Sequence, residues 1–435
     1  MKEETIIKKE TATKNLVKPT PEQVEWANCE IGVLIHYDVQ VFHPTGYQFG
    51  NVPAPVLFNP IQLDTDQWIE TAKAAGAGYA VLVAKHGSGF CLWPSSAHDY
   101  SILNSPYLNG QGDIVSNFIG SCEKYGLRPG IYYHTGYNAY CHVDNPGKVL
   151  SGDSEEQKHY NSIVIQQLTE LWTNYGKLFE IWFDGGVLSL EKGGPDIVPL
   201  LWKHQPKAVV FQGPKGTPSL ARWVGNEQGK APYPCWSTVG DFTGDNECPP
   251  PGSGSAEGTV WAPAESDMPN RNHQWIWIED TDYLLYSVDE LVECYYLSVG
   301  RNTNLLIGMV IDNRGLVPDA DVRQFAAFGN KIRHQFSREI KEVCGQGDTL
   351  TMDIGWPTQI NHVVIMENIA EGERVREYIV EAMVDQEWTA ICHGFSIGHK
   401  RIERFETIKA SQVRFRCVSS IAVPLIQSLA VLKSN

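Results

Sequence analysis

The chain has 435 residues, 42% of them apolar, and its 35 basic and 51 acidic side chains give a formal net charge of −16. This length exceeds one ordinary domain and suits a barrel of about 250 residues followed by a smaller domain. The acidic balance argues against nucleic acid and anionic membrane surfaces as partners. Because no apolar run approaches about 18 residues, we expect no membrane-spanning helix.

Residues 1–20 form a polar leader without the apolar core of a signal peptide. The protein is therefore expected either to remain in the cytoplasm or to be periplasmic or extracellular, with an export signal already removed from this sequence.

Ten cysteines are scattered without a Cys-x-x-Cys pair, which indicates reduced, buried thiols rather than a zinc site or a disulfide framework.

A repeating pattern of strand followed by helix begins near residue 31. Short apolar, β-branched or aromatic runs predict strands at 31–36, 79–84, 130–133, 178–183, 208–211, 221–224, 274–278 and 305–310. Segments with helical spacing of apolar residues predict helices at 64–76, 113–124, 155–175, 288–299 and 319–336. This alternation predicts a (β/α)8-type barrel over residues 21–338, irregular in its later helices.

The apolar period changes near residue 345 from about 3.6 residues to about 2. Leu350, Met352 and Ile354 alternate with polar residues, and similar short runs follow to the end of the chain. Short alternating runs without helical spacing predict an antiparallel β-sandwich over residues 339–435. The helix at 319–336 is expected to join the two domains.

Polar residues follow the ends of the first four predicted strands. These residues are His36, His86, His134 and Asp184. Because the carboxyl ends of barrel strands converge, we expect these side chains to share one site. A zinc site is the first rival interpretation, but no pair has the His-x-His or His-x-x-x-His spacing of a chelate. No metal or organic cofactor is therefore expected.

Asp184 ends an aromatic run and precedes two glycines, so it is either a catalytic carboxylate or the cap of a turn. A retaining glycosidase needs a nucleophilic carboxylate and a second acid about 5–5.5 Å away. Glu227 is the candidate partner, with Trp223 expected to bury it and Asn226 to hydrogen-bond it, which would favour its protonated form. Glu227 could equally be an exposed loop acid, and Glu265 competes for the same role.

Four segments together resemble glycoside hydrolase family 29, the α-L-fucosidases. They are residues 32–37 (GVLIHY), residues 85–95 (KHGSGFCLWPS) with 99–101 (DYS), residues 180–185 (EIWFDG) and residues 298–306 (SVGRNTNLL). The similarity extends in order from about residue 20 to about residue 335. It implies a barrel with a C-terminal β-sandwich and an active site for terminal fucose.

The resemblance also implies roles for individual residues. Asp184 matches the family nucleophile, which attacks the anomeric carbon of fucose. The implied substrate-binding residues are His36, His86, His134, Tyr133, Trp223 and Trp93. The segment 222–227 (RWVGNE) is similar to the subgroup that prefers fucose α-1,3- or α-1,4-linked to N-acetylglucosamine. In that subgroup its Glu, here Glu227, is the acid/base.

Two departures affect sugar recognition. Many family members carry His-Asp after the residue matching His86, where this chain has Gly87-Ser88, and Tyr37-Asp38 replaces Trp-Gly. The expected activity is a retaining exo-α-L-fucosidase acting on α-1,3/4-fucosylated, Lewis-type oligosaccharides or glycoconjugates. Another exo-glycosidase specificity on the same barrel and a non-catalytic fucose- or glycan-binding protein are the alternatives.

Overall fold

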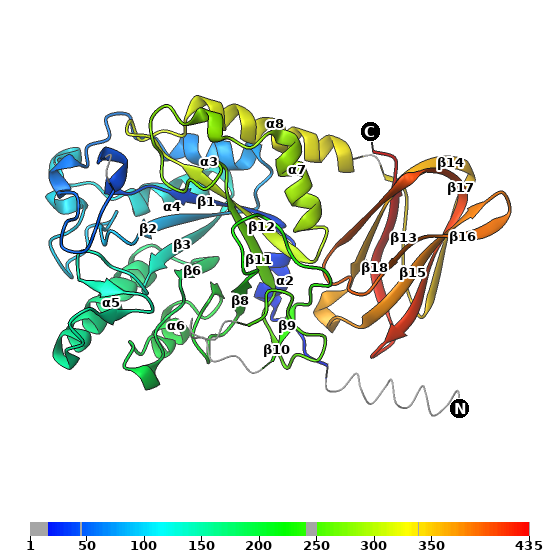
Figure 1. The fold of residues 1–435 in the computed structure, drawn as a ribbon, viewed down its shortest axis with the longest axis horizontal. Coiled ribbons are helices and arrows are strands. Elements are labelled where there is room, and N and C mark those ends of the chain that lie inside the picture. The colour runs from blue at the N-terminus through cyan, green and yellow to red at the C-terminus, as the bar shows by residue number, and fades with distance from the viewer. Residues whose placement is uncertain (1–15, 44–45, 241–249, 338, 435) are drawn as a thin grey trace.

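The structure is a computed structural model, and it describes residues 16–43, 46–240, 250–337 and 339–434. Figure 1 shows a barrel surrounded by helices and, beside it, a C-terminal sheet. Residues 1–15 of the predicted leader and Cys248 lie outside the described residues. Among the cysteines that are described, none forms a disulfide bond.

Within the described residues, a closed barrel of eight parallel strands forms the larger part. The strands follow one another around the barrel in chain order: β1 (Ile31–His36), β2 (Tyr79–Lys85), β3 (Arg128–His134), β6 (Glu180–Asp184), β7 (Val209–Phe211), β8 (Leu220–Trp223), β11 (Ala264–Pro269) and β12 (Thr303–Val310). Closure is made by β12 beside β1, with Ile31 opposite Leu305. The predicted barrel is therefore confirmed.

Helices cover the outside of the barrel. They are α3 (Thr65–Ala74), α4 (Ile114–Tyr125), α5 (Ser154–Asn174), α6 (Val198–His204), α7 (Val288–Leu297) and α8 (Asp319–Phe336). Side chains of Asp64, Asp113 and Asp153 cap the first turns of α3, α4 and α5, as the free N–H groups there require. A loop at residues 212–219 joins β7 to β8, so the barrel is irregular in its later connections, as predicted.

Short elements complete the structure. Two small ribbons pair β4 (Val143–Asp144) with β5 (Lys148–Val149), and β9 (Thr238–Val239) with β10 (Val260–Trp261). Single 3-10 turns occur at Val39–Phe42, Pro55–Leu57, Ile102–Asn104, Tyr107–Gly110, Leu190–Lys192, Asp282–Leu284 and Ile369–Glu371. Within the described residues, no helix combines the length and hydrophobicity needed to cross a bilayer.

The seventh barrel strand differs from the prediction. We expected a strand at 274–278, but this segment is a loop and the strand is β11 (Ala264–Pro269). The prediction was wrong because β11 has the polar sequence Glu265-Ser266-Asp267 and ends in a proline, features that indicate a loop. All of its residues are nevertheless buried.

The amino ends of the strands are covered by the short helix α2 (Pro21–Ala27). Gln23 Nε2 donates to the carbonyls of Leu220 and Trp261 at 2.8 and 3.1 Å. The Trp26 indole donates to Glu180 at 3.1 Å. The barrel interior is packed with aromatic and aliphatic side chains such as Tyr79 and Trp182. A ligand can therefore enter at the carboxyl ends of the strands, as is usual for this architecture.

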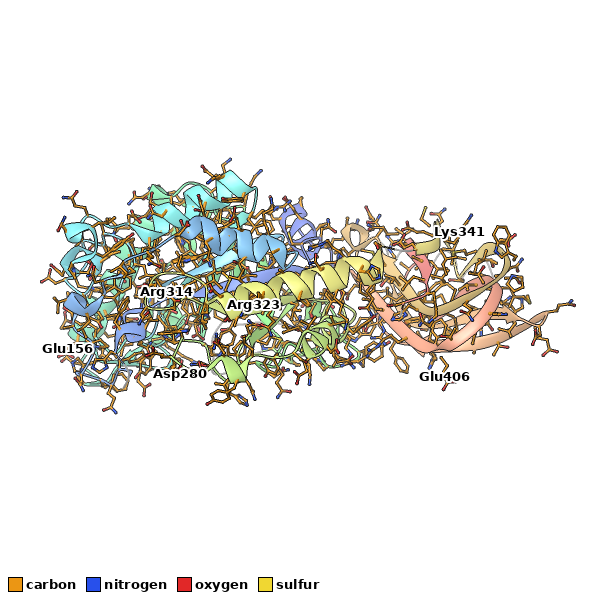
Figure 2. All side chains as sticks on the ribbon, turned by 90° about the horizontal axis from the view of Figure 1, so that it is seen from above. Glu156, Asp280, Arg314, Arg323, Lys341 and Glu406 are labelled. Carbon is orange, nitrogen blue, oxygen red and sulfur yellow. The ribbon has the colours of Figure 1, made fainter. Side chains whose placement is uncertain are left out.

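Residues 339–434 form a six-stranded antiparallel sheet that confirms the predicted C-terminal β-structure. In spatial order its strands are β13 (Glu339–Gln346), β18 (Leu425–Leu432), β14 (Thr349–Glu367), β17 (Arg401–Ser420), β15 (Val375–Val384) and β16 (Glu387–Gly394). The long strands β14 and β17 have register shifts that bend them, so the sheet encloses its own apolar core. In Figure 2, α8, which carries Arg323, runs along the barrel towards this sheet, which carries Lys341.

Candidate active site

A cavity opens at the carboxyl ends of the barrel strands. Strand ends and the loops after them contribute its lining residues, which are Leu34, His36, His86, Tyr132, Trp182, Asp184, Glu227, Asp267 and Trp275. The cavity therefore brings together His36, His86, Asp184 and Glu227, which lie far apart in the sequence. Among the described residues, no group of three or more His, Cys, Asp or Glu side chains is arranged to hold a metal ion.

Asp184 is the last residue of β6, and its carboxylate faces the cavity. The Tyr132 hydroxyl donates to Asp184 Oδ2 at 2.6 Å, and His134 Nε2 lies 3.3 Å from the same oxygen. Burial raises the pKa of Asp184, but His134 and Tyr132 outweigh that effect and hold the pKa below its usual value. Because 40% of the side chain is exposed, Asp184 is an ionised and accessible carboxylate, as a nucleophile must be.

His134 is oriented by its other ring nitrogen. The backbone N–H of Tyr137 donates to His134 Nδ1 at 3.2 Å, so the proton of the neutral ring is on Nε2, the atom that faces Asp184. Burial lowers the pKa of His134, which favours this neutral form. The neutral ring therefore presents its Nε2–H towards Asp184 Oδ2 at an Nε2–Oδ2 distance of 3.3 Å, beside the hydrogen bond from Tyr132.

Two neutral histidines line the cavity beside Tyr132. Burial lowers the pKa of His36 to about 4 and that of His86 to about 3. The His86 ring stacks on Tyr132, with centroids 5.9 Å apart and an interplanar angle of 11°. His36 packs against Trp275, with ring centroids 4.9 Å apart. Uncharged rings with ring nitrogens provide both donors and acceptors for hydroxyl groups, which suits a sugar.

Glu227 reaches the cavity from the loop that follows β8. The Trp275 indole donates to Glu227 Oε2 at 3.0 Å, while the Glu227 side chain is otherwise exposed. The loop is held by the Gly229 N–H, which donates to the carbonyl of Asp267 at 2.9 Å. Gly229 has a φ of +63°, and a Cβ there would lie 2.6 Å from Met268 Sδ, so glycine is needed at this turn.

The expected neighbours of Glu227 are different from those found. Trp223 does not bury Glu227, which is exposed; the Trp223 indole instead donates to Asp267 Oδ1 at 2.7 Å. Asn226 does not hydrogen-bond Glu227 either; its side chain spans the loop, donating to the carbonyl of Lys230 and accepting from the N–H of Gln228. The sequence could not show this because the partners Asp267 and Trp275 lie on β11 and the loop after it, where the strand assignment was wrong.

Glu265, the rival acid, lies below the cavity in the barrel interior. Tyr79 donates its hydroxyl to Glu265 Oε1, and the Trp182 indole donates to Oε2 at 2.8 Å. Burial raises the pKa of Glu265 to about 7, in spite of these hydrogen bonds. Glu265 is fully buried and does not line the cavity, whereas Trp182 does.

Two predicted sugar contacts face away from the cavity. The Tyr133 hydroxyl donates to Gln167 at 2.6 Å and the Trp93 indole to Glu170 at 2.9 Å, both on α5 outside the barrel. Successive strand residues point to opposite faces, so Tyr132, not Tyr133, lies on the cavity side of β3. Tyr133 and Trp93, which were expected to bind substrate, are therefore not among the residues that line this cavity.

Sequence reasoning also missed five residues that line the cavity, which are Leu34, Tyr132, Trp182, Asp267 and Trp275. The position of Tyr132 was predictable, because it is two residues before His134 and shares its face of β3. Asp267 is two residues after Glu265 and shares its face of β11, but this segment was not recognised as a strand. Trp275 lies in a loop, and no local pattern places a loop side chain in a distant site.

An ionised aspartate and a second carboxyl group, brought together by a parallel barrel among neutral histidines and aromatic rings, are the parts of a glycoside hydrolase site. A sequence model of the family described as alpha-L-fucosidase matches residues 17–334. The chain therefore belongs to the alpha-L-fucosidase family, glycoside hydrolase family 29.

Several relatives are similar over most of the chain. Alpha-L-fucosidase 1 of Arabidopsis thaliana is 28% identical over 91% of this chain and 83% of its own length. A Bacteroides thetaiotaomicron crystal structure assigned as an alpha-L-fucosidase is 35% identical, with a TM-score of 0.88 over 97% of this chain and 100% of that chain. A Ruminococcus gnavus GH29 fucosidase in complex with fucose shares the fold, with 23% identity and a TM-score of 0.81 over 96% of this chain and 95% of that one.

Proposed function

We propose that this protein is a retaining exo-α-L-fucosidase in which Asp184 is the nucleophile and Glu227 the acid/base. The observation that carries the proposal is that both carboxyl groups line one cavity, from strand β6 and from the loop after β8. Asp184 is held ionised by Tyr132 and His134, and Glu227 is accessible, so the two groups are suited to different steps.

The reaction follows from this arrangement in two displacements. In the first, an Asp184 oxygen bonds to the anomeric carbon of fucose while the glycosidic C–O bond breaks, and Glu227 gives its proton to the leaving oxygen. In the second, Glu227 takes a proton from a water molecule, whose oxygen bonds to the anomeric carbon as the bond to Asp184 breaks. Fucose leaves with its original configuration, and both carboxyl groups return to their starting protonation states.

The other side chains have supporting roles in this proposal. His134 and Tyr132 orient Asp184, and Trp275 orients Glu227 through its indole N–H. His36 and His86, as neutral rings in the wall of the cavity, bind sugar hydroxyls. The predicted role of Trp223 becomes indirect, because its indole is engaged by Asp267.

We propose further that the preferred substrates carry fucose α-1,3- or α-1,4-linked to N-acetylglucosamine. Two features support this preference: the Arg222–Glu227 segment resembles the corresponding subgroup, and Glu227 is exposed in a loop at the mouth of the barrel. An acid/base at that position can reach the leaving oxygen of a branched sugar that remains largely outside the cavity.

The test compares kcat/KM for an aryl α-L-fucoside, a Lewis-type trisaccharide and an α-1,2-fucosylated galactoside. We expect the Lewis-type substrate to be preferred over the α-1,2-linked one by at least about tenfold, which corresponds to about 1.4 kcal/mol of transition-state binding. Preference for the α-1,2 linkage would refute the linkage proposal alone. Fucose binding without hydrolysis of any of the three would refute the enzyme and favour a fucose-binding protein. The Asp184→Gly variant measures the background rate.

A further inference from the structure

A further carboxyl group lines the cavity, and the two displacement steps do not use it. Asp267 is on β11, two residues after Glu265 and therefore on the same face of the strand. Because Asp267 is nearer the carboxyl end of β11, it lines the cavity, whereas Glu265 does not. Only 3% of Asp267 is exposed. A buried carboxyl group that lines a binding cavity, in addition to its contact with Trp223, indicates a role towards the ligand.

Asp267 is fixed on two sides. The Trp223 indole donates to Asp267 Oδ1 at 2.7 Å. The Asp267 carbonyl accepts from the N–H of Gly229, in the loop that carries Glu227. The Trp223 hydrogen bond thus fixes the side chain through Oδ1, the Gly229 hydrogen bond fixes the backbone, and the residue lines the cavity.

The protonation state of Asp267 decides what it can offer. Burial raises the pKa of Asp267 well above its usual value, and the carboxyl groups of Glu227 and Glu265 raise it further, although the Trp223 hydrogen bond acts in the opposite direction. These surroundings therefore favour the protonated carboxyl group of Asp267 over the ionised one. One oxygen accepts the indole hydrogen, and the other carries a hydrogen that it can donate.

We propose that Asp267 is a substrate-binding residue that hydrogen-bonds a polar oxygen of the sugar held between Asp184 and Glu227. This inference rests on the proposed roles of those two residues. An ionised group at this position would oppose the charge on Asp184, whereas a neutral donor binds a sugar oxygen without that cost. A sugar lacking the contacted oxygen would leave the buried donor unpaired and would be bound less well.

The test uses the variants Asp267→Asn and Asp267→Ala, each assayed with an aryl α-L-fucoside and with a Lewis-type trisaccharide. The Asn side chain keeps an oxygen for the Trp223 indole and an N–H in place of the O–H, so kcat/KM should stay within about threefold of the wild type. The Ala side chain removes both, and we expect a fall in kcat/KM of about 10- to 100-fold on both substrates, mainly through KM. The affinity of the Asp184→Gly protein for L-fucose, measured by calorimetry, should fall by a similar factor when Asp267→Ala is added.

Three results would overturn the proposal. If Asp267→Ala lowers thermal stability but leaves KM and fucose affinity unchanged, Asp267 only supports Trp223, and the roles of Asp184 and Glu227 are unaffected. If Asp267→Asn loses turnover of the trisaccharide but not of the aryl fucoside, Asp267 is the proton donor and the role of Glu227 is wrong as well. Full activity of the Asp184→Gly protein would refute the proposed function itself. If the Ala variant does not fold, Asp267→Ser provides the same comparison.

Discussion

The hydroxyl of Tyr132 provides a direct test of how the fold prepares Asp184. In the Tyr132→Phe variant the ring that stacks on Trp182 and His86 remains, and only the hydrogen bond to Asp184 Oδ2 is lost. Asp184 must be ionised to attack the sugar, and this bond favours the ionised form. Its removal should therefore raise the pKa of Asp184, so that activity is lost at a higher pH as the solution is made more acidic.

The size of the effect follows from the setting of the bond. A hydrogen bond to a charged group contributes about 1.5–3 kcal/mol when it is well buried. The Asp184 side chain is 40% exposed, so water replaces part of that contribution, and about 1 kcal/mol is the appropriate scale. Since about 1.4 kcal/mol corresponds to one pKa unit, the acidic limb of kcat/KM should move up by about 0.5 to 1 pH unit.

The assay is the pH profile of kcat/KM with an aryl α-L-fucoside. Tyr133→Phe is the matched control, because the neighbouring hydroxyl bonds to Gln167 on the other side of β3. This control should lose stability but keep the acidic limb of the wild type. An unmoved acidic limb in Tyr132→Phe, or an equal shift in both variants, would refute the account of how Asp184 is kept ionised.

Three further predictions concern the acid/base and its surroundings. Glu227→Ala should lower kcat on a Lewis-type trisaccharide by about 10²–10⁴-fold. An aryl fucoside with a good leaving group should be affected much less, because its leaving oxygen does not need a proton. Glu265→Gln should not show this difference between the two substrates. The fold favours neutral Glu265, so wild-type stability should fall as pH rises from about 4.5 to above about 7. Urea unfolding at about pH 5 and about pH 8 measures how the free energy of unfolding changes with pH. This change should be smaller in Glu265→Gln than in the wild type, by up to on the order of 3 kcal/mol. An equal change in the two proteins would contradict the assignment of Glu265 as a buried, neutral acid. A Cβ on Gly308 would lie 2.5 Å from Trp275 Cζ3, so Gly308→Ala should displace the indole from Glu227 and lower trisaccharide turnover by about tenfold. Gly120 has open space around it, so Gly120→Ala is the control and should not lower turnover. Equal kinetics of the two variants would refute this role of Trp275.

Much of the barrel and one wall of its site could be predicted from the sequence. The strands near His36, His86, His134 and Asp184 are short apolar runs between turns, and a parallel barrel brings their carboxyl ends together whatever the details of packing. Polar residues at such ends are therefore placed in one region by topology alone.

The opposite wall depends on contacts that no local pattern contains. β11 is a barrel strand with two buried carboxyl groups, which are stable there because Tyr79, Trp182 and Trp223 hydrogen-bond them. Those partners come from other strands, so their effect cannot be read from the β11 sequence. The choice of Tyr133 over Tyr132 had a different cause, since the alternation of side chains along β3 was sufficient to decide between them.

The central claim is that Asp184 forms the bond to fucose and Glu227 transfers the proton. It is tested most directly by the anomeric configuration of the fucosyl azide formed when azide is added to the Asp184→Gly and Glu227→Ala variants. The account predicts β-L-fucosyl azide from Asp184→Gly, because azide replaces the nucleophile from the opposite face, and α-L-fucosyl azide from Glu227→Ala, because azide attacks the fucosyl-enzyme. Absence of rescue in both variants, or β-L-fucosyl azide from Glu227→Ala, would contradict it.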